Sequence, residues 1–263
     1  MASGSLSRVE STLLRVRPAT LAAAAKVLFR VQRREVGVRA GTFLVDPVSN
    51  LGAELIRTGE YEPPMTRRLA TSLGAGMTFV DVGANEGYFT VVASSLVGTS
   101  GHVVSIEPQR RAVGILATNL RLNRCSNVDV VQAAVGDATG SLVIHLMPSV
   151  NTGASSASRP VRYPTRRERV RQAKLDDLLP SLSVDTVDVM KIDVEGYESR
   201  VIDGARDLFR RGVVRHVALE LHPRQLRTLG TTPRDVVFLM ESLGFACTVL
   251  GDSAWCVFGS ETS

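Results

Sequence analysis

The sequence predicts an α/β fold in which helices cover both faces of a doubly wound, mostly parallel sheet. Short apolar runs with strand composition alternate along the chain with stretches in which apolar residues recur at helical spacing. The first of these strands ends in a glycine-containing turn that leads directly into a helix. Later strands end at acidic residues, and ligands of such sheets sit at the carboxyl ends of the strands. These three observations together favour the doubly wound arrangement.

The first strand and its helix carry the clearest signal. Residues 79–82 are an apolar run that stops at Gly83, and apolar residues then recur at helical spacing between positions 89 and 96. Gly83 and Gly87 permit a sharp turn and a close approach of the backbone, and Asn85 tolerates a left-handed conformation. This spacing predicts a strand, a tight turn and a helix.

The second strand, at residues 102–106, ends in Glu107. The two carboxylate oxygens of Glu107 can accept hydrogen bonds from both hydroxyls of a ribose that is held above the first turn. We therefore expect a cofactor that contains adenosine with a free ribose diol.

The turn also indicates which cofactor. A dinucleotide site has a G-x-G-x-x-G turn whose amides approach a pyrophosphate, whereas here Asp81 stands just before the glycines. A carboxylate at this place repels phosphate and suits a cationic amine, and S-adenosylmethionine carries an amine, a sulfonium and no phosphate. An NAD site or a purely structural turn is the alternative. The predicted cofactor-binding residues are Asp81, Gly83, Asn85, Gly87, Tyr88, Glu107 and Asp137.

Asp137 follows the predicted third strand. Residues 112–120 carry a helical apolar stripe, residues 128–131 form the strand, and residues 141–146 alternate like an extra strand. At the carboxyl edge of the sheet, Asp137 can accept from the adenine amine. The alternative is a turn aspartate before Thr139 and Gly140.

Residues 147–174 lack apolar periodicity and are rich in Ser, Asn, Gly, Pro and Arg. A loop of this length inside a domain is usually functional or disordered. One interpretation is a lid over an acidic or oxygen-rich substrate, and the other is a solvated basic loop without a specific partner.

The predicted catalytic residues lie after the fourth and fifth strands. Residues 187–192 form a strand with Asp193 at its carboxyl end, followed by a helical face at residues 201–209. Residues 213–221 form the next strand, which leads to Glu220 and His222 at the same edge. Asp193, Glu220 and His222 are therefore expected to converge. The alternative for Asp193 is a helix N-cap.

A last helix and a hairpin close the domain. Thr232 and Pro233 begin a helix that ends near Gly244, and residues 245–249 and 255–258 form a hairpin through Gly251 and Asp252.

Length and composition are those of one sizeable enzyme domain, with 263 residues of which 44% are hydrophobic. Three cysteines, Cys125, Cys247 and Cys256, are too few for a disulfide framework and wrongly spaced for zinc. They predict buried thiols in a reducing compartment, and hence a cytoplasmic protein. The net charge of +5 decides nothing about nucleic acid, because much of the excess is local.

The N-terminal extension, residues 1–40, is basic and predicted to be helical or partly disordered. Residues 19–25 fall far short of the roughly 20 apolar residues that a membrane-spanning helix needs. The extension therefore packs on the domain or binds a membrane surface, and a transit peptide is a further alternative. The main domain is predicted at residues 41–258, followed by a tail at 259–263.

From about Gly41 to Phe258 the chain resembles the FkbM-type S-adenosylmethionine-dependent methyltransferases. The resemblance rests on residues 59–63, 80–90, 106–108, 174–178 and 191–198, together with Asn119 and Asn123. It implies a seven-stranded Rossmann-like class I methyltransferase sheet with an antiparallel last strand. It also implies methyl transfer to a hydroxyl of a small-molecule, sugar, polyketide or lipid-linked natural product. The sequence departs from the family at Glu86 and in its arginine-rich loop.

The expected mechanism is an in-line displacement at the sulfonium methyl. Asp193 or His222 is the expected general base, with the other residue or a bound Mg²⁺ orienting the acceptor oxygen. Related sugar methyltransferases hold a divalent metal at these strand ends, which would make Asp193 and Glu220 the ligands. A methyltransferase that acts on RNA or protein is one alternative, although no aromatic interleaving accompanies the arginines, so a nucleic acid partner is not expected. A catalytically silent cofactor-binding module is the other.

Overall fold

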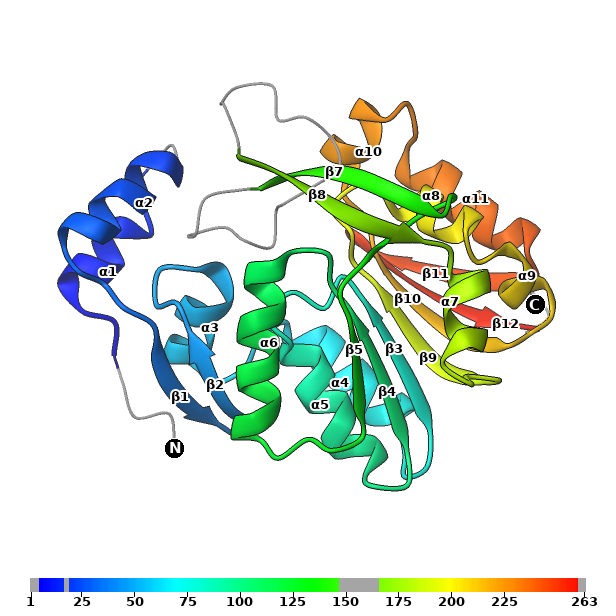
Figure 1. Cartoon of the computed structure of the whole chain (residues 1–263), viewed down its shortest axis with the longest axis horizontal. Helices are drawn as coiled ribbons and strands as arrows, with labels where there is room; N and C mark the ends of the chain where they lie inside the picture. Colours follow the sequence, from blue (N-terminus) through cyan, green and yellow to red (C-terminus); the bar gives the residue numbers. More distant parts are fainter. Residues whose placement is uncertain (1–4, 17–18, 147–165, 260–263) are drawn as a thin grey trace.

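The computed structural model describes residues 5–16, 19–146 and 166–259, and shows a central sheet with helices on both faces (Figure 1). Seven strands form this sheet in the order β11-β12-β10-β9-β3-β4-β5. They are β3 (Thr78–Val82), β4 (His102–Ile106), β5 (Val128–Val131), β9 (Val187–Ile192), β10 (Val214–Glu220), β11 (Phe245–Leu250) and β12 (Ser253–Phe258). β12 runs antiparallel to both neighbours, whereas the other pairs are parallel. The predicted doubly wound, mostly parallel α/β fold is confirmed.

Two hydrophobic cores lie on the two faces of the sheet, because successive side chains of a strand point to opposite sides. In β3, Phe79 packs into one core, and Val80 and Val82 pack into the other. The helices on the Phe79 face are α3 (Asn50–Thr58), α4 (Pro63–Ser72), α5 (Tyr88–Val97) and α6 (Arg110–Leu122). Those on the opposite face are α7 (Leu175–Ser181), α8 (Glu198–Asp203), α9 (Arg206–Arg210), α10 (Pro223–Thr228) and α11 (Pro233–Ser242).

The helical face predicted at residues 201–209 is divided between α8 and α9 at Gly204. An added Cβ at Gly204 would lie 2.0 Å from the carbonyl oxygen of Gly136, and the Gly204 carbonyl accepts from the Asp176 amide. Glycine at position 204 therefore lets the backbone pass close to the segment at Gly136.

A three-stranded sheet corrects the prediction of a lid-like loop over residues 147–174. β8 (Arg166–Ala173) pairs antiparallel with β7 (Gly140–Leu146) and parallel with β6 (Ala134–Val135). Val170 is buried against the other two strands, while the four arginines of β8 are exposed. These arginines hide the strand in the sequence. Lys174 is the N-cap of α7, and the rest of the predicted loop, residues 147–165, lies outside the described residues.

The N-terminal segment is built into the domain, so the predicted boundary between residues 40 and 41 is wrong. After α1 (Arg8–Leu13) and α2 (Ala19–Leu28), β1 (Arg34–Val38) and β2 (Gly41–Val45) form a hairpin whose turn contains that boundary. Arg33 donates to both carboxylate oxygens of Glu86 at 2.5 and 3.0 Å, and Lys26 pairs with Asp46. These ion pairs hold the extension against the domain. Of the predicted tail, only Gly259 is described.

No helix in the described part of the chain is both long and apolar enough to cross a membrane. Val27 and Leu28 of α2 are nevertheless largely exposed, at 78% each.

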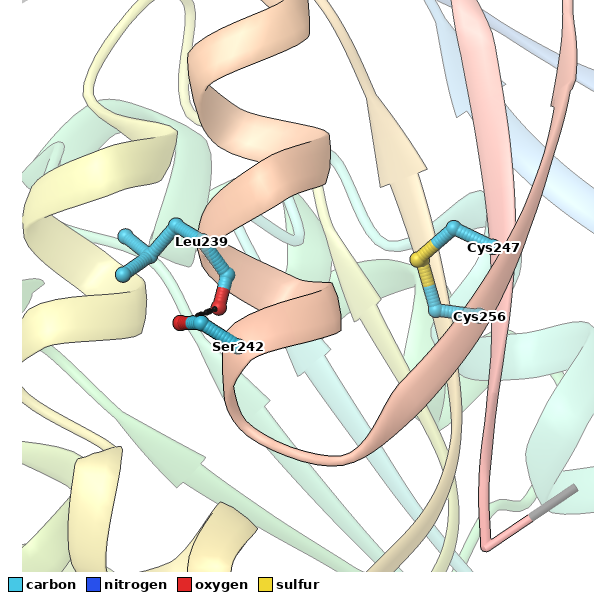
Figure 2. Close-up of a disulfide and its surroundings, with 4 residues drawn as sticks. All are labelled: Leu239, Ser242, Cys247 and Cys256. Atoms are coloured by element: carbon cyan, nitrogen blue, oxygen red, sulfur yellow. Dashed lines mark hydrogen bonds between the residues drawn. A yellow bond between two sulfur atoms is a disulfide. The ribbon is translucent and has the colours of Figure 1, made fainter. Parts of the chain in front are cut away.

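A disulfide joins β11 to β12 and corrects the prediction of reduced cysteines (Figure 2). Cys247 and Cys256 are direct partners in the hairpin, and their Cα atoms are 4.0 Å apart. The pairing depends on the strand register, which cysteine spacing alone does not give. Cys256 faces the core beneath α11, whereas the adjacent Trp255 faces the other side of the sheet. Cys125 is a free thiol.

Candidate active site

A cavity of about 220 Å³ lies at the carboxyl edge of the parallel strands. Its lining includes Gly83 and Asn85 after β3, Glu107 after β4, Asp193 after β9, and Glu220 at the end of β10. The chain proceeds from β3 to β4 on one side and to β9 and β10 on the other. This is the switch point at which doubly wound sheets bind ligands.

The turn between β3 and α5 forms one wall of the cavity. Gly83, Asn85 and Gly87 adopt left-handed conformations, with φ angles of 85°, 49° and 85°. A Cβ at Gly83 would lie 1.9 Å from the carbonyl oxygen of Asp193. Glycine at this position therefore lets the turn pack directly against the end of β9.

Glu107 anchors the same turn from β4. Its carboxylate oxygens accept from the backbone amides of Asn85 and Gln109, each at 2.9 Å. Burial raises the pKa of Glu107 to about 7, and the two amide hydrogen bonds oppose this rise. Each oxygen keeps a lone pair with which it can accept from a ligand hydroxyl.

An unpartnered polar atom in the cavity wall tests whether an adenosine cofactor fits. Asn85 Oδ1 is buried and has no hydrogen-bond partner among the described residues. Beside the acceptors of Glu107, it offers a further acceptor to a polar ligand. The donor-rich ribose and amine of S-adenosylmethionine fit this arrangement.

Three predicted cofactor residues support the cavity from outside its lining. Asp81 is 1% exposed and accepts from the Thr90 hydroxyl at 2.7 Å, and burial raises its pKa. Gly87 packs against α6 and is the N-cap position of α5. Tyr88 packs beside Phe43, and its hydroxyl accepts from the Tyr61 amide at 3.3 Å.

Asp137 is not brought to the cavity. Its carboxylate accepts from Arg200 at 2.5 Å, and it is absent from the cavity lining. Ala133, Ala134 and Val135 line the cavity at this point instead. A contact between Asp137 and adenine stays a prediction that the ion pair does not favour.

Lys191 places a positive charge beneath the cavity. It is 1% exposed in β9, and its Nζ donates to Asp193 Oδ2 at 2.8 Å. Burial acts to lower the pKa of Lys191, but the charges of Asp193 and Asp81 outweigh it and raise the pKa. Burial acts to raise the pKa of Asp193, but the charges of Lys191 and His222 lower it. Lys191 and Asp193 therefore form an ionised pair.

His222 is surrounded by carboxylates. Its Nδ1 lies 2.7 Å from Oε1 of the fully buried Glu198, and its Nε2 lies 3.7 Å from both Asp193 and Glu195. Burial acts to lower the pKa of His222, but the hydrogen bond to Glu198 and the charge of Glu195 raise it to about 9. The ring is therefore a cation at neutral pH.

Glu220 completes the cluster. Burial and the charge of Asp193 raise its pKa to about 8, and its Oε2 is buried without a hydrogen-bond partner in the described chain. Ligand-type atoms of Asp193, Glu220 and His222 lie within 4.8 Å of one another. The structure therefore brings together the three residues predicted to be catalytic. Asp193 is not a helix N-cap, because Tyr197 holds that position before α8.

Several residues of the site carried only weak signals in the sequence. Lys191 is a lysine within a mostly apolar strand, which indicates a buried charge with a partner. Glu62 lines the cavity with a φ of 43° directly before two prolines, and burial raises its pKa. Glu195 also has a positive φ, of 52°, and accepts from Gln225 at 2.8 Å. Their roles depend on neighbours that only the fold brings close.

The sequence matches the family described as Methyltransferase FkbM domain over residues 81–247. This range begins at Asp81 in β3, ends at Cys247 in β11, and includes the whole cluster around His222. No curated protein matches the chain in sequence.

Three solved structures show the kind of protein to which the chain is similar. The methyltransferase FkbM from Methylobacillus flagellatus KT has 16% identity and a TM-score of 0.47, over 82% of this chain and 63% of that chain. Aeropyrum pernix fibrillarin, in complex with natively bound S-adenosyl-L-methionine, has 14% identity and a TM-score of 0.45, over 74% of each chain. A SAM-dependent O-methyltransferase from Thermotoga maritima has 12% identity and a TM-score of 0.45, over 91% of this chain and 82% of that chain. The chain thus spans 63% of the length of the FkbM protein.

Proposed function

Since the chain belongs to the FkbM methyltransferase family, we propose that it is an S-adenosylmethionine-dependent enzyme that methylates a hydroxyl oxygen. The proposed acceptor is a small-molecule, sugar, polyketide or lipid-linked natural product. The observation that carries the proposal is Glu220, a carboxyl group with a raised pKa at the edge where the cofactor cavity lies. A hydroxyl needs a nearby proton acceptor as it becomes an ether oxygen.

When bound, S-adenosylmethionine supplies a methyl group on a sulfonium, and this carbon bonds to the acceptor oxygen as its bond to sulfur breaks and S-adenosylhomocysteine leaves. The chain itself binds the two substrates, orients them and excludes water from the site. In well-oriented systems, such positioning lowers the activation barrier by up to roughly 7–11 kcal/mol. Glu107 and Asn85 provide the acceptors for the ribose diol and other donors of the cofactor. The ionised carboxylate of Asp193 favours the cationic end of the cofactor.

We assign the proton transfer to Glu220 rather than to the expected bases Asp193 and His222. Asp193 is ion-paired with Lys191 and has a lowered pKa, and the pKa of His222, about 9, lies further above neutrality than that of Glu220. A general base works best when its pKa lies near the working pH, and the pKa of Glu220 is about 8. Asp193 and His222 then hold Glu220 and the acceptor oxygen in place.

The cluster fits Mg²⁺ poorly, although Asp193 and Glu220 are the ligands expected for it. Mg²⁺ prefers oxygen ligands in an octahedral arrangement, whereas Lys191 already donates to Asp193 and the third group is a protonated imidazole. The proposed reaction therefore uses no metal ion. Activity that is unchanged by EDTA is the expected result, and recovery by added Mg²⁺ after EDTA treatment would contradict it.

The experiment that tests the function is methyl transfer from labelled S-adenosylmethionine into separate fractions of small metabolites, RNA and protein. We expect label in the small-metabolite fraction. Label in RNA or protein, with steep salt dependence for RNA, would support the alternative acceptors, and no transfer with intact cofactor binding would support a silent module.

Asp193→Asn is the matched variant for that experiment, because it keeps the shape of the side chain and removes its charge. We expect about 100-fold or greater loss of turnover with cofactor affinity within a few fold. Asp185→Asn, an exposed position just before β9, is the control. Normal turnover in Asp193→Asn would exclude a role for this carboxylate in catalysis.

The cytoplasmic location of the protein stays a prediction. The cytoplasmic prediction relied on reduced cysteines, and the disulfide between Cys247 and Cys256 removes that support. Structural disulfides are rare in reducing compartments.

A further inference from the structure

A groove beside the cofactor cavity is the strongest unassigned feature. It has a volume of about 660 Å³ and lies between α4 and the turn of the β11–β12 hairpin. Glu62 and Glu220 line both the groove and the cofactor cavity. A molecule in the groove therefore reaches the carboxyl group to which the proton transfer is assigned.

One side of the groove is apolar. Met65, Pro64 and Leu250 line this side, together with Trp255 of β12, which is 7% exposed. Leu250 is 66% exposed, so the groove presents uncovered apolar surface. Apolar side chains of this kind suit the CH-rich face of a sugar or another ring.

The other side carries positive charge from one face of α4. Pro64, Arg68 and Thr71 recur at helical spacing along the groove, with Arg67 next to them. The guanidinium carbon of Arg68 stands over the Trp255 ring, 4.6 Å from its centre, so this arginine covers one face of the indole. Within the described residues, neither Arg67 nor Arg68 has an ion pair.

The acidic and basic groups of the groove are therefore separated. Carboxylates lie at its inner end, where the cofactor cavity begins, and Arg67 and Arg68 lie along α4. A ligand that matches this pattern has a neutral hydroxyl at one end and an anionic group at the other. Arginine binds carboxylate and phosphate through two parallel hydrogen bonds.

We propose that this groove is the acceptor site and that the acceptor is an acidic glycoside, a hydroxylated ring that carries a carboxylate or phosphate group. Its ring lies against Met65, Pro64 and Leu250 beside Trp255, its anion pairs with Arg67 and Arg68, and the hydroxyl to be methylated faces Glu220. The proposal rests on the proposed O-methyltransferase function, which it narrows to one substrate class.

Trp255 makes the groove directly observable, because it is the single tryptophan of the chain. The full chain, saturated with S-adenosylhomocysteine, is titrated with three 4-nitrophenyl β-D-glycosides that differ in one group: the neutral glucoside, the glucuronide and the glucoside 6-phosphate. The nitrophenyl group quenches tryptophan emission. We expect an acidic probe to bind at least about tenfold more tightly than the glucoside, and the tighter of the two acids identifies the anion as carboxylate or phosphate.

Arg67→Gln and Arg68→Gln test the role of the arginines. Each variant is expected to bind the acidic probe about tenfold or more weakly, because it loses a charged hydrogen bond. Its affinity for the glucoside should stay within about twofold. Arg210→Gln is the control, since Arg210 is exposed on α9 at the opposite face of the sheet. Equal binding of all three probes, no quenching by any of them, or Arg67→Gln and Arg68→Gln variants that behave like Arg210→Gln would each overturn the proposal.

Calorimetry with S-adenosylmethionine on the same proteins separates the two proposals. Normal cofactor binding and methyl transfer without a preference for acidic probes would overturn the acidic acceptor alone. Selective binding of acidic probes without any cofactor binding or methyl transfer would instead overturn the proposed function on which this inference rests.

Discussion

Glu220 gives the reaction a pH dependence whose direction follows from its raised pKa. A carboxyl group accepts a proton only when ionised, and the pKa of Glu220 is about 8 rather than its usual value near 4.5. Turnover should therefore rise with pH through neutrality and level off above about 8. Glu220→Gln should lose this rise and about 100-fold or more of the rate, as measured by pH profiles of kcat.

Glu241→Gln is the control for that profile, because Glu241 is exposed in α11, away from the cluster. A rise that persists unchanged in Glu220→Gln would show that another group, such as Glu195 with its pKa of about 7, accepts the proton.

Glu107 is the second residue with a distinct expected effect. In Glu107→Ala the ribose loses its acceptors, and the amides of Asn85 and Gln109 lose theirs. S-adenosylmethionine affinity should fall by about 2–4 kcal/mol, roughly 30- to 1000-fold, measured by calorimetry. Asp129→Ala, an exposed acid at β5, is the control. Unchanged affinity in Glu107→Ala with a normal melting temperature would refute the ribose assignment.

At the scale of elements, the β3–α5 turn depends on the absence of a side chain at Gly83. Gly83→Ala adds a Cβ within 1.9 Å of the Asp193 carbonyl at a φ of 85°. We expect at least about 1–3 kcal/mol of strain and a loss of cofactor binding that exceeds the loss of stability, because the turn must move away from β9.

Gly114→Ala is the matched control for Gly83→Ala. Gly114 lies within α6, and nothing lies within 4 Å of the added Cβ. Its free energy of unfolding should rise by about 0.5–1 kcal/mol. Urea denaturation and calorimetry of both variants compare the two effects, and equal behaviour would contradict the close approach at Gly83.

The disulfide between β11 and β12 determines how many thiols of the protein can react. The denatured, unreduced protein should show one reactive thiol, Cys125, and three after reduction. Cys256→Ser should lower the free energy of unfolding by about 2–3 kcal/mol, with Cys125→Ser as the control. Three thiols without reductant would show that the purified protein does not carry the disulfide.

Elements with strong apolar patterns could be predicted from the sequence, and elements held by pairing could not. β3 and β9 lie inside the central sheet and are buried on both faces, so most of their residues are apolar. β8 stands in a small sheet with one exposed face, and its arginines remove the apolar pattern. β1 likewise has only half-buried or exposed residues.

In the whole molecule, the sequence predicts where the residues of the candidate site lie but not which of them carry a proton. The positions of Asp193, Glu220 and His222 follow from strand ends, which the sequence marks. Their protonation states do not, because they depend on Lys191 and on Glu198 at the start of the next helix, and on how deeply the folded chain buries each group. The assignment of the proton acceptor to Glu220 therefore required the structure.

The strand order of the sheet also sets the order in which the molecule can be completed during synthesis. β3 lies between β4 and β9, yet β4 and β5 are finished by Val131 and β9 begins only at Val187. At about 5–20 residues per second, a ribosome needs roughly 5–20 s to pass from the end of β3 to the end of β9. Throughout this interval the nascent chain presents an unpaired, apolar strand edge, which is the kind of surface that aggregates. Chaperones that bind nascent chains should therefore associate most strongly with this protein while residues 132–186 are being translated.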